Sequence, residues 1–223
     1  GFCDLDEPGL EDMLQTAQAS GLLNFSSALD ARPSEIFIVA VGTPVGEDGD
    51  PELEPLRLAA ADVAAVLKPG DLVMLRSTVP IGATRNEFMP RLESDSGLKA
   101  GEDFFIGFAP ERTAEGRAIQ ELRTLPQIIG GLTSPCLRRS SAFWATVSAS
   151  QVQTPSLEAA ELAKLANNTF RDVSFAFSNE LALIADQFNI DAFETIRAAN
   201  EGYPRNPISM PSPGVGGYCL TKD

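Results

Sequence analysis

Continuous apolar runs alternate with helical patterns along the N-terminal part of the chain. The runs cover residues 36–41, 72–76 and 104–108, and a shorter run covers 127–131. An apolar run of this length fits a strand that is buried on both faces, as strands are in a parallel sheet. Because the strands alternate with helices, the pattern predicts an α/β fold that contains part of a Rossmann-like parallel sheet.

Helices are expected where apolar residues recur at helical spacing and glycine or proline ends the pattern. The first such pattern opens at Leu10 and closes at Gly21. The chain starts without an initiator methionine or a signal-peptide pattern, so we expect this helix to follow an element that is absent. Further helices are predicted over 53–67, 83–92 and 135–147.

The peptides that follow the predicted strands are the natural place for a ligand. In open α/β sheets, ligands bind at the carboxyl ends of the strands. Three strands end in the peptides Gly42-Thr43-Pro44, Ser77-Thr78-Val79-Pro80 and Ala109-Pro110-Glu111. Together they form the expected binding rim, although each peptide by itself also fits an ordinary β-to-α turn.

The pattern changes near residue 154. A helical pattern runs without interruption over 156–188, with Ser156 as a suitable N-cap, and a second helix is expected over 191–200. A long helix with an apolar stripe usually links domains or builds a dimer interface. The sequence therefore predicts two domains, 1–153 and 154–223, of which the second is all-helical.

Composition excludes several classes of function. The formal net charge of −14 disfavours binding to nucleic acid, and no apolar run is long enough to span a bilayer. The chain has no histidine, which removes Ser-His-Asp and Cys-His catalysis and zinc sites that need imidazole. The three cysteines are far apart and have no metal-binding spacing, so we expect a reducing, cytoplasmic location and no metal.

The C-terminal run around Cys219 offers a nucleophile. Gly216 and Gly217 have no Cβ, so a ligand can approach the backbone closely there. If a helix starts at Cys219, the thiol shares a face with the carboxylate of Asp223, and the helix start favours the thiolate. A buried cysteine beside a glycine turn is the alternative.

Two further polar pairs are ambiguous by spacing alone. Lys164 and Asn168 lie four residues apart on the long helix and could both donate to a developing oxyanion, or belong to a solvated helix face. Glu111 and Glu115 could be a pair of working carboxylates, or an exposed acidic turn with Arg112.

Taken together, five segments in order resemble the UDP-glucose/GDP-mannose dehydrogenase family. Each segment is a weak signal alone, but together they extend over nearly the whole chain. The segments are Val41–Pro44, Ser77–Gly82, Pro110–Gly116, Glu158–Phe170 with Ser178–Leu181, and Gly214–Asp223.

The resemblance implies an enzyme that uses NAD to oxidise the primary alcohol of a nucleotide sugar to a carboxylate. This is a four-electron oxidation without release of the aldehyde. A thiolate can trap an aldehyde as a thiohemiacetal, whose oxidation gives a thioester that water then hydrolyses. Lys, Asp, Glu and water can carry the proton transfers, so the absence of histidine is no obstacle.

The resemblance also implies roles for single residues. The catalytic residues are Cys219 as nucleophile, Lys164 and Asn168 as stabilisers of the oxyanion, Asp223 and Thr78 in water positioning and proton transfer, and Glu111 in thioester hydrolysis. The cofactor-binding residues are Thr43, Thr78, Glu115 beside the nicotinamide, and Lys222.

Two features of the family pattern are absent. The chain shows neither the Gly-rich G-x-G-x-x-G turn that holds the pyrophosphate nor a third domain after Asp223. We therefore expect a fragment that binds NAD poorly by itself. Arg112 favours the branch that acts on UDP-N-acetylmannosamine or UDP-N-acetylglucosamine, whereas Tyr218 is commoner in UDP-glucose enzymes, which remain the alternative.

Two other classes of function stay open. The chain could be a non-catalytic dimerisation module, because the long helix over 156–188 is expected to pair in a homodimer. It could also be a thioester-forming acyltransferase, which the absence of histidine disfavours.

Overall fold

The computed structural model describes residues 6–29 and 34–212, and the chain forms two compact units, 1–162 and 163–223. The division between the units falls inside α6 (Leu157–Gln187). The domain boundary expected from the sequence, between residues 153 and 154, lies just before this helix and stays a prediction.

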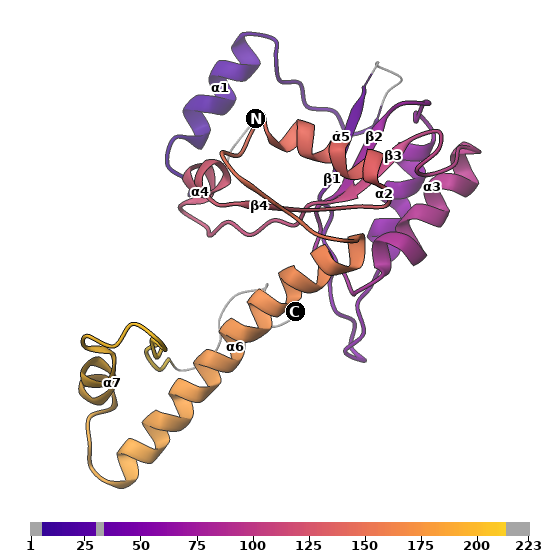
Figure 1. The fold of residues 1–223 in the computed structure, drawn as a ribbon. Helices are drawn as coiled ribbons and strands as arrows, with labels where there is room; N and C mark the ends of the chain where they lie inside the picture. The colour runs from indigo at the N-terminus through magenta and orange to yellow at the C-terminus, as the bar shows by residue number, and fades with distance from the viewer. Residues whose placement is uncertain (1–5, 30–33, 213–223) are drawn as a thin grey trace. The chain divides into compact units, whose positions relative to one another are not determined.

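The first unit is built on a five-stranded sheet (Figure 1). Its strands follow one another in the sheet as they do in the chain: β1 (Ile36–Val39), β2 (Leu72–Leu75), β3 (Phe105–Phe108), β4 (Gln127–Gly131) and β5 (Gln151–Gln153). Strands β1, β2 and β3 are parallel, and β5 is parallel to β4. The predicted α/β fold is therefore confirmed.

The sheet differs from the prediction in three details. Strand β4 runs antiparallel to β3. Gln127 at the start of β4 contacts Arg76, which directly follows β2, so β4 begins at the edge of the sheet where β2 and β3 end. Periodicity cannot reveal this direction, since a buried strand has the same apolar run in either sense. Strand β5 was missed, and β1 is not buried on both faces, because Ile38 is 44% exposed.

Helices cover both faces of the sheet. Helix α5 (Ser134–Trp144) packs on the face that carries Leu72, Met74 and Ile129. Helices α2 (Glu54–Ala64) and α3 (Met89–Ser96) pack against each other on the other side (Figure 1). All four residues of β2 are buried between these layers, and each such apolar side chain contributes roughly 1.5–3 kcal/mol.

Helix α5 approaches β3 and β4 closely, which glycine makes possible. A Cβ at Gly107 would collide with the side chain of Ser140, and a Cβ at Gly131 would collide with the backbone of Leu137. Glycine inside a strand commonly marks such a close approach. A larger residue at either position would push α5 away from the sheet.

The helix predicted over 83–92 begins as a π-helical turn, η1 (Thr84–Phe88), and continues as α3. Pro90 has no N–H to donate to the preceding turn, so a regular α-helix through this point would lose a hydrogen bond and meet the proline ring. A π-turn absorbs the irregularity, and such turns are frequent at functional sites. Two short helices complete the unit, α1 (Leu10–Ala19) and α4 (Ala118–Thr124), of which α4 was not predicted.

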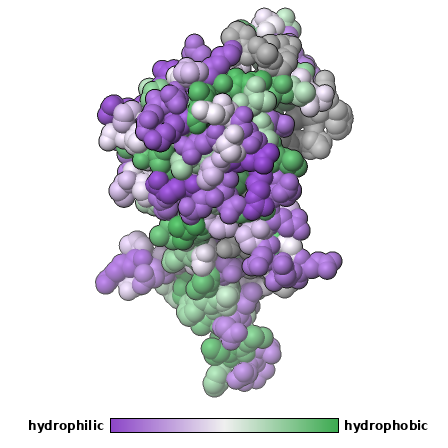
Figure 2. Space-filling view, turned by 90° about the vertical axis from the view of Figure 1, so that its right-hand side faces the viewer, coloured by the Kyte–Doolittle hydropathy of each residue, from purple (hydrophilic) through white to green (hydrophobic). Residues whose placement is uncertain are grey.

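The second unit contains most of α6 and the helix α7 (Ala192–Asn200). The predicted long helix and its cap are confirmed, since the hydroxyl of Ser156 accepts from the N–H of Ala159 at 3.2 Å. Asp191 caps α7 by accepting from the N–H of Glu194 at 3.0 Å. Apolar side chains remain exposed on this unit, as the space-filling view shows (Figure 2).

Candidate functional site

The ends of β1 and β2 are joined by two hydroxyl groups. Ser77 Oγ donates to the carbonyl of Val41, and Thr43 Oγ1 donates to the carbonyl of Thr78, both at 2.6 Å. The strands are parallel, so their carboxyl ends meet at one edge of the sheet, and these bonds hold the two following loops side by side. The first two predicted rim peptides therefore lie together, and Thr43 is buried between them with 4% exposure.

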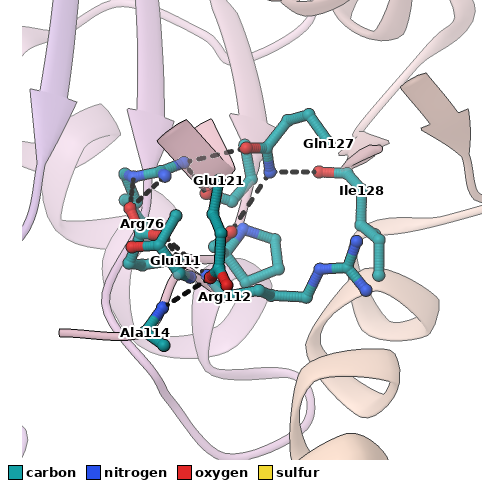
Figure 3. A network of polar contacts seen from close by, with 10 residues as sticks. Arg76, Glu111, Arg112, Ala114, Glu121, Gln127 and Ile128 are labelled. Carbon is teal, nitrogen blue, oxygen red and sulfur yellow. Dashed lines mark hydrogen bonds and ion pairs between the residues drawn. The ribbon is translucent and has the colours of Figure 1, made fainter. Parts of the chain in front are cut away.

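Arg76 joins the second rim peptide to the third. Its Nε donates to Oε2 of Glu111 at 3.1 Å, and its Nη2 forms an ion pair with the same oxygen (Figure 3). Its Nη1 donates to the carbonyl of Ala109 at 3.0 Å and to Oε1 of Gln127 at 3.3 Å. The guanidinium also lies over the ring of Trp144, 4.5 Å from the centroid, in a cation–π contact.

The carboxylate of Glu111 is held from both sides. Its second oxygen, Oε1, accepts from the backbone N–H groups of Arg112 and Thr113, both at 2.7 Å. Partial burial by itself raises the pKa of Glu111, but the charge of Arg76 and the hydrogen bonds from Thr113 and Arg76 together lower that pKa below its usual value. Glu111 is therefore an anion at neutral pH.

Glu111 and Glu115 line one pocket of about 300 Å³. It is lined by both acidic and apolar residues. The acidic residues are Asp6, Glu7, Glu111 and Glu115, and the apolar ones include Leu10, Ala118, Ile119 and Leu122. The segment before α1 is tied to this wall, because Glu7 Oε1 accepts from the N–H of Ile119 at 3.0 Å. The structure thus brings the two carboxylates together around a cavity, and adds Asp6 and Glu7, which sequence reasoning missed.

Lys164 and Asn168 lie side by side on α6, as their spacing predicts. Lys164 Nζ donates to Asn168 Oδ1 at 3.5 Å, and Asn168 is buried, with 8% exposure. A lysine ammonium and an asparagine amide can both donate to a developing negative charge. Their role in an oxyanion site stays a prediction.

The segment that leads toward Cys219 is fastened to the helical unit. Asn200 at the end of α7 donates to the carbonyl of Ile208 at 2.9 Å and accepts from its N–H at 2.8 Å. Asn179 on α6 accepts from the N–H of Ser212 at 2.9 Å. The predicted site residues Cys219, Lys222 and Asp223 lie outside the described residues.

The first turns of α6 are bound to the loop after β2. Glu161 is buried and accepts from the N–H of Gly82 at 2.5 Å and from the hydroxyl of Thr84 at 2.5 Å. Glu158 pairs with Arg85 at 2.5 Å, and the hydrogen bond from Arg85 lowers the pKa of Glu158 to about 2. Sequence reasoning included both glutamates only in the segment Glu158–Phe170 that resembles the family, and assigned neither a role.

Sequence reasoning also missed Arg76 and Gln127. Each is a polar residue at the end of an apolar run, Arg76 just after β2 and Gln127 at the start of β4. Because ligands bind at this edge of the sheet, a polar residue at the end of a buried strand was the sequence signal that could have identified both residues. The described residues contain no group of three or more acidic, cysteine or histidine side chains that could hold a metal ion.

Two family models match the chain. The model described as the NAD binding domain of the UDP-glucose/GDP-mannose dehydrogenase family matches residues 1–148. The model described as the central domain of the same family matches residues 158–223. The two matches follow each other in order and leave only a short segment between them.

Named relatives are similar over the whole chain. The UDP-N-acetyl-D-mannosamine dehydrogenase of Yersinia pestis is 37% identical over 229 residues, covering 100% of this chain and 54% of that protein. The NDP-N-acetyl-D-galactosaminuronic acid dehydrogenase of Ralstonia solanacearum is 36% identical over 223 residues, covering 97% of this chain and 52% of that protein. This chain thus spans about half the length of these relatives.

A solved structure shows the same fold. The structure of UDP-D-ManNAc dehydrogenase from Pyrococcus horikoshii superposes with a TM-score of 0.93 at 35% identity. The match covers 99% of this chain and 52% of that one.

Proposed function

Because the chain belongs to the UDP-glucose/GDP-mannose dehydrogenase family, we propose that the protein of which it is a part oxidises the C6 alcohol of a nucleotide sugar to the carboxylate. The observation that carries this proposal is the ordered match of both family domains, at 1–148 and 158–223. Relatives 35–38% identical over nearly the whole chain are named as dehydrogenases of this kind. Since the chain spans about half of their length, the reaction and substrate are proposals for the whole protein.

NAD is the cofactor that the match to the NAD binding domain supports. The pocket beside Glu115 fits the nicotinamide end of NAD chemically, because a flat cationic ring suits a pocket lined by both apolar and acidic residues. Glu115, Leu10 and Ile119 would hold that ring, and the Thr43 and Thr78 loops would contact the cofactor at the same strand edge. When bound, NAD supplies the acceptor for hydride.

The chain's own residues would carry the remaining steps. Lys164 and Asn168 donate hydrogen bonds to the oxygen that becomes negative when a thiolate adds to the aldehyde. Cys219 supplies that thiolate and Asp223 a proton acceptor, with Thr78 and Lys222 in the supporting roles that the family resemblance implies. During hydrolysis the water oxygen bonds to the thioester carbon, the C–S bond breaks, the sulfur leaves as thiolate, and the water protons pass to acceptors in the site.

We favour UDP-N-acetyl-D-mannosamine as the substrate, because several relatives carry that name. Other relatives are named for an N-acetylgalactosamine derivative. The names therefore support N-acetylated nucleotide sugars as the substrate class. Arg112, the residue that favoured this branch, donates to the carbonyl of Pro126 and so braces the loop next to the pocket. UDP-glucose is the alternative substrate.

A homodimer through α6 is the proposed assembly. Phe170, Val173 and Phe177 are 75%, 59% and 54% exposed on this helix. Large apolar side chains at such exposure favour burial against a second copy.

We also propose a cytoplasmic location. Separately, within the described residues no helix combines the length and apolar character that a membrane span needs.

A panel of nucleotide sugars tests the proposed function. The full-length protein is incubated with NAD and UDP-N-acetyl-D-mannosamine, UDP-N-acetylglucosamine, UDP-glucose or GDP-mannose, and NADH and the sugar acid are both measured. We expect two NADH per acid formed, and the highest kcat/KM with an N-acetylated sugar. If none of the four sugars supports NADH formation, the proposal is contradicted.

A further inference from the structure

The loop that follows β2 is held at its start by the neighbouring strand end. Ser77 Oγ donates to the carbonyl of Val41, and the carbonyl of Thr78 accepts from Thr43 Oγ1, both at 2.6 Å. Thr78 is half-buried, and within the described residues its own hydroxyl makes no hydrogen bond. This hydroxyl is therefore available to a ligand at the carboxyl edge of the sheet, where ligands bind in folds of this type.

The same loop is held at its far end by one carboxylate. Glu161 accepts from the N–H of Gly82 through Oε2 at 2.5 Å, and through Oε1 from the N–H and the hydroxyl of Thr84 at 2.9 and 2.5 Å. Glu161 is 1% exposed and Thr84 is 0% exposed, and all three residues belong to the first unit. Solvent therefore has little access to replace the carboxylate as the hydrogen-bond partner.

Gly82 makes the turn that leads into η1. Its φ is +88°, a backbone conformation that residues with a Cβ rarely adopt. The N–H groups at the start of a helix have no partner inside the helix and commonly bind an anion. Here the N–H groups of Gly82 and Thr84 bind the protein's own carboxylate, so they are not available to a phosphate group of a ligand.

The segment between the two ends of the loop is short and packed. Val79 is 2% exposed and Ala83 is 5% exposed. The N–H of Ala83 donates to the carbonyl of Pro80 at 3.1 Å, which closes a turn inside the segment. Close-packed segments transmit displacements, so a shift at Gly82 reaches Thr78.

We propose that Glu161 is a positioning residue, which fixes the far end of this loop and thereby places the hydroxyl of Thr78 for the cofactor. The inference deepens the proposed function, because it rests on the cofactor contact proposed for Thr78. Glu161 acts through the loop, because its carboxylate is buried and already accepts from three donors.

A neighbouring ion pair supplies the matched control. Glu158 lies three residues before Glu161 on α6 and pairs with Arg85 of η1 at 2.5 Å. In the described part of the chain, the hydrogen bonds of its side chain to other elements go to Arg85. Glu158→Gln therefore weakens a second contact between α6 and η1 and leaves the loop before Thr84 attached.

Hydrogen exchange followed by mass spectrometry tests the contact without any activity. The full-length parent is compared with Glu161→Gln and Glu158→Gln. Glutamine keeps the size of the side chain but has one acceptor oxygen where the carboxylate has two. We expect exchange in the peptide over 77–84 to become about tenfold faster in Glu161→Gln, and to stay at the parent rate in Glu158→Gln.

Thr84→Val is measured in parallel, because it removes only the hydroxyl donor and keeps the shape of the side chain. We expect it to speed exchange in the same peptide by a smaller factor. Exchange at the parent rate in both Glu161→Gln and Thr84→Val overturns the inference.

A double-mutant cycle tests whether Glu161 acts through Thr78. Calorimetry measures the Kd for NAD of the full-length parent, Glu161→Gln, Thr78→Ala and the double variant. We expect each single substitution to weaken binding about fivefold to tenfold, and the double variant to bind no more weakly than Thr78→Ala. Losses that multiply in the double variant show independent effects and refute the inference.

Steady-state kinetics separates positioning from a loss of folded protein. Positioning raises KM for NAD in Glu161→Gln, whereas a smaller amount of folded enzyme lowers the apparent kcat and leaves this KM unchanged. An unchanged KM therefore counts against the inference. A parent protein that shows the coupling in NAD binding but oxidises none of the four nucleotide sugars would contradict only the proposed function.

Discussion

The carboxylate of Glu161 accepts both the hydroxyl and the backbone N–H of Thr84, at 2.5 and 2.9 Å. It also accepts from the N–H of Gly82, and the glutamate is only 1% exposed. Three donors therefore satisfy one buried anion at the start of the π-helical turn. Such a charge is tolerated in the interior only because every donor is in place.

Replacement of Glu161 by alanine should destabilise the first unit. Two backbone N–H groups and one hydroxyl would lose their partner, and each unsatisfied buried group costs about 1–3 kcal/mol. Urea unfolding followed by circular dichroism measures the loss. The matched control is Glu180→Ala, which removes an exposed glutamate from the same helix, and equal midpoints for the two variants would contradict the prediction.

Acid should weaken the pair between Glu158 and Arg85. Since the hydrogen bond from Arg85 lowers the pKa of Glu158 from 4.5 to about 2, the stabilisation is present above pH 4.5 and is lost as the pH falls toward 2. We expect the difference in melting temperature between the parent and Glu158→Gln to be constant from pH 7 to about pH 5 and to shrink below that. A difference that grows on acidification would refute the assignment.

Loss of the ammonium of Lys164 should affect the rate more than binding. If Lys164 stabilises an oxyanion, Lys164→Met in the full-length protein lowers kcat about 10²–10³-fold, with a smaller change in KM. Lys99→Met is the control, because Lys99 is an exposed lysine paired with Glu102. Steady-state kinetics with the preferred nucleotide sugar measures both variants, and parent-like kcat in Lys164→Met would exclude the role.

Substitution of Cys219 should stop formation of the sugar acid. A serine hydroxyl is a much poorer nucleophile than a thiolate, so Cys219→Ser should form no thioester. The control is Cys136→Ser, which removes a buried cysteine of α5. Acid formed by Cys219→Ser at the parent rate, measured by chromatography, would show that the nucleophile is assigned wrongly.

Charge on the exposed face of α6 should separate the proposed dimer. Phe170→Glu and Phe177→Glu place carboxylates among apolar side chains that a second copy would bury. Analytical ultracentrifugation of the full-length protein is expected to show a shift from dimer to monomer. Phe25→Glu is the control, since Phe25 is 65% exposed in the first unit, and a dimer that survives both α6 substitutions would argue against this interface.

Local chemistry was sufficient to predict the elements of the fold. Apolar runs predicted β1 to β4, and helical patterns predicted α6, with Ser156 as its cap, and α7. These features depend on residues close together in the chain, so they can be recognised without knowledge of the fold. The antiparallel direction of β4 and the π-turn at Thr84–Phe88 were missed, because strand direction and helix register depend on distant contacts.

The sequence by itself determined the family and the type of fold, and it predicted a binding rim from the peptides with Thr43, Thr78 and Glu111. Only the tertiary structure decided that Arg76 meets Glu111 and Gln127, although 35 and 51 residues respectively separate Arg76 from them along the chain. The partner of a buried charge is chosen by which strand ends share an edge and by which donors are left inside, and neither is written in local spacing. The ion pair between Arg76 and Glu111 therefore depends on the tertiary structure.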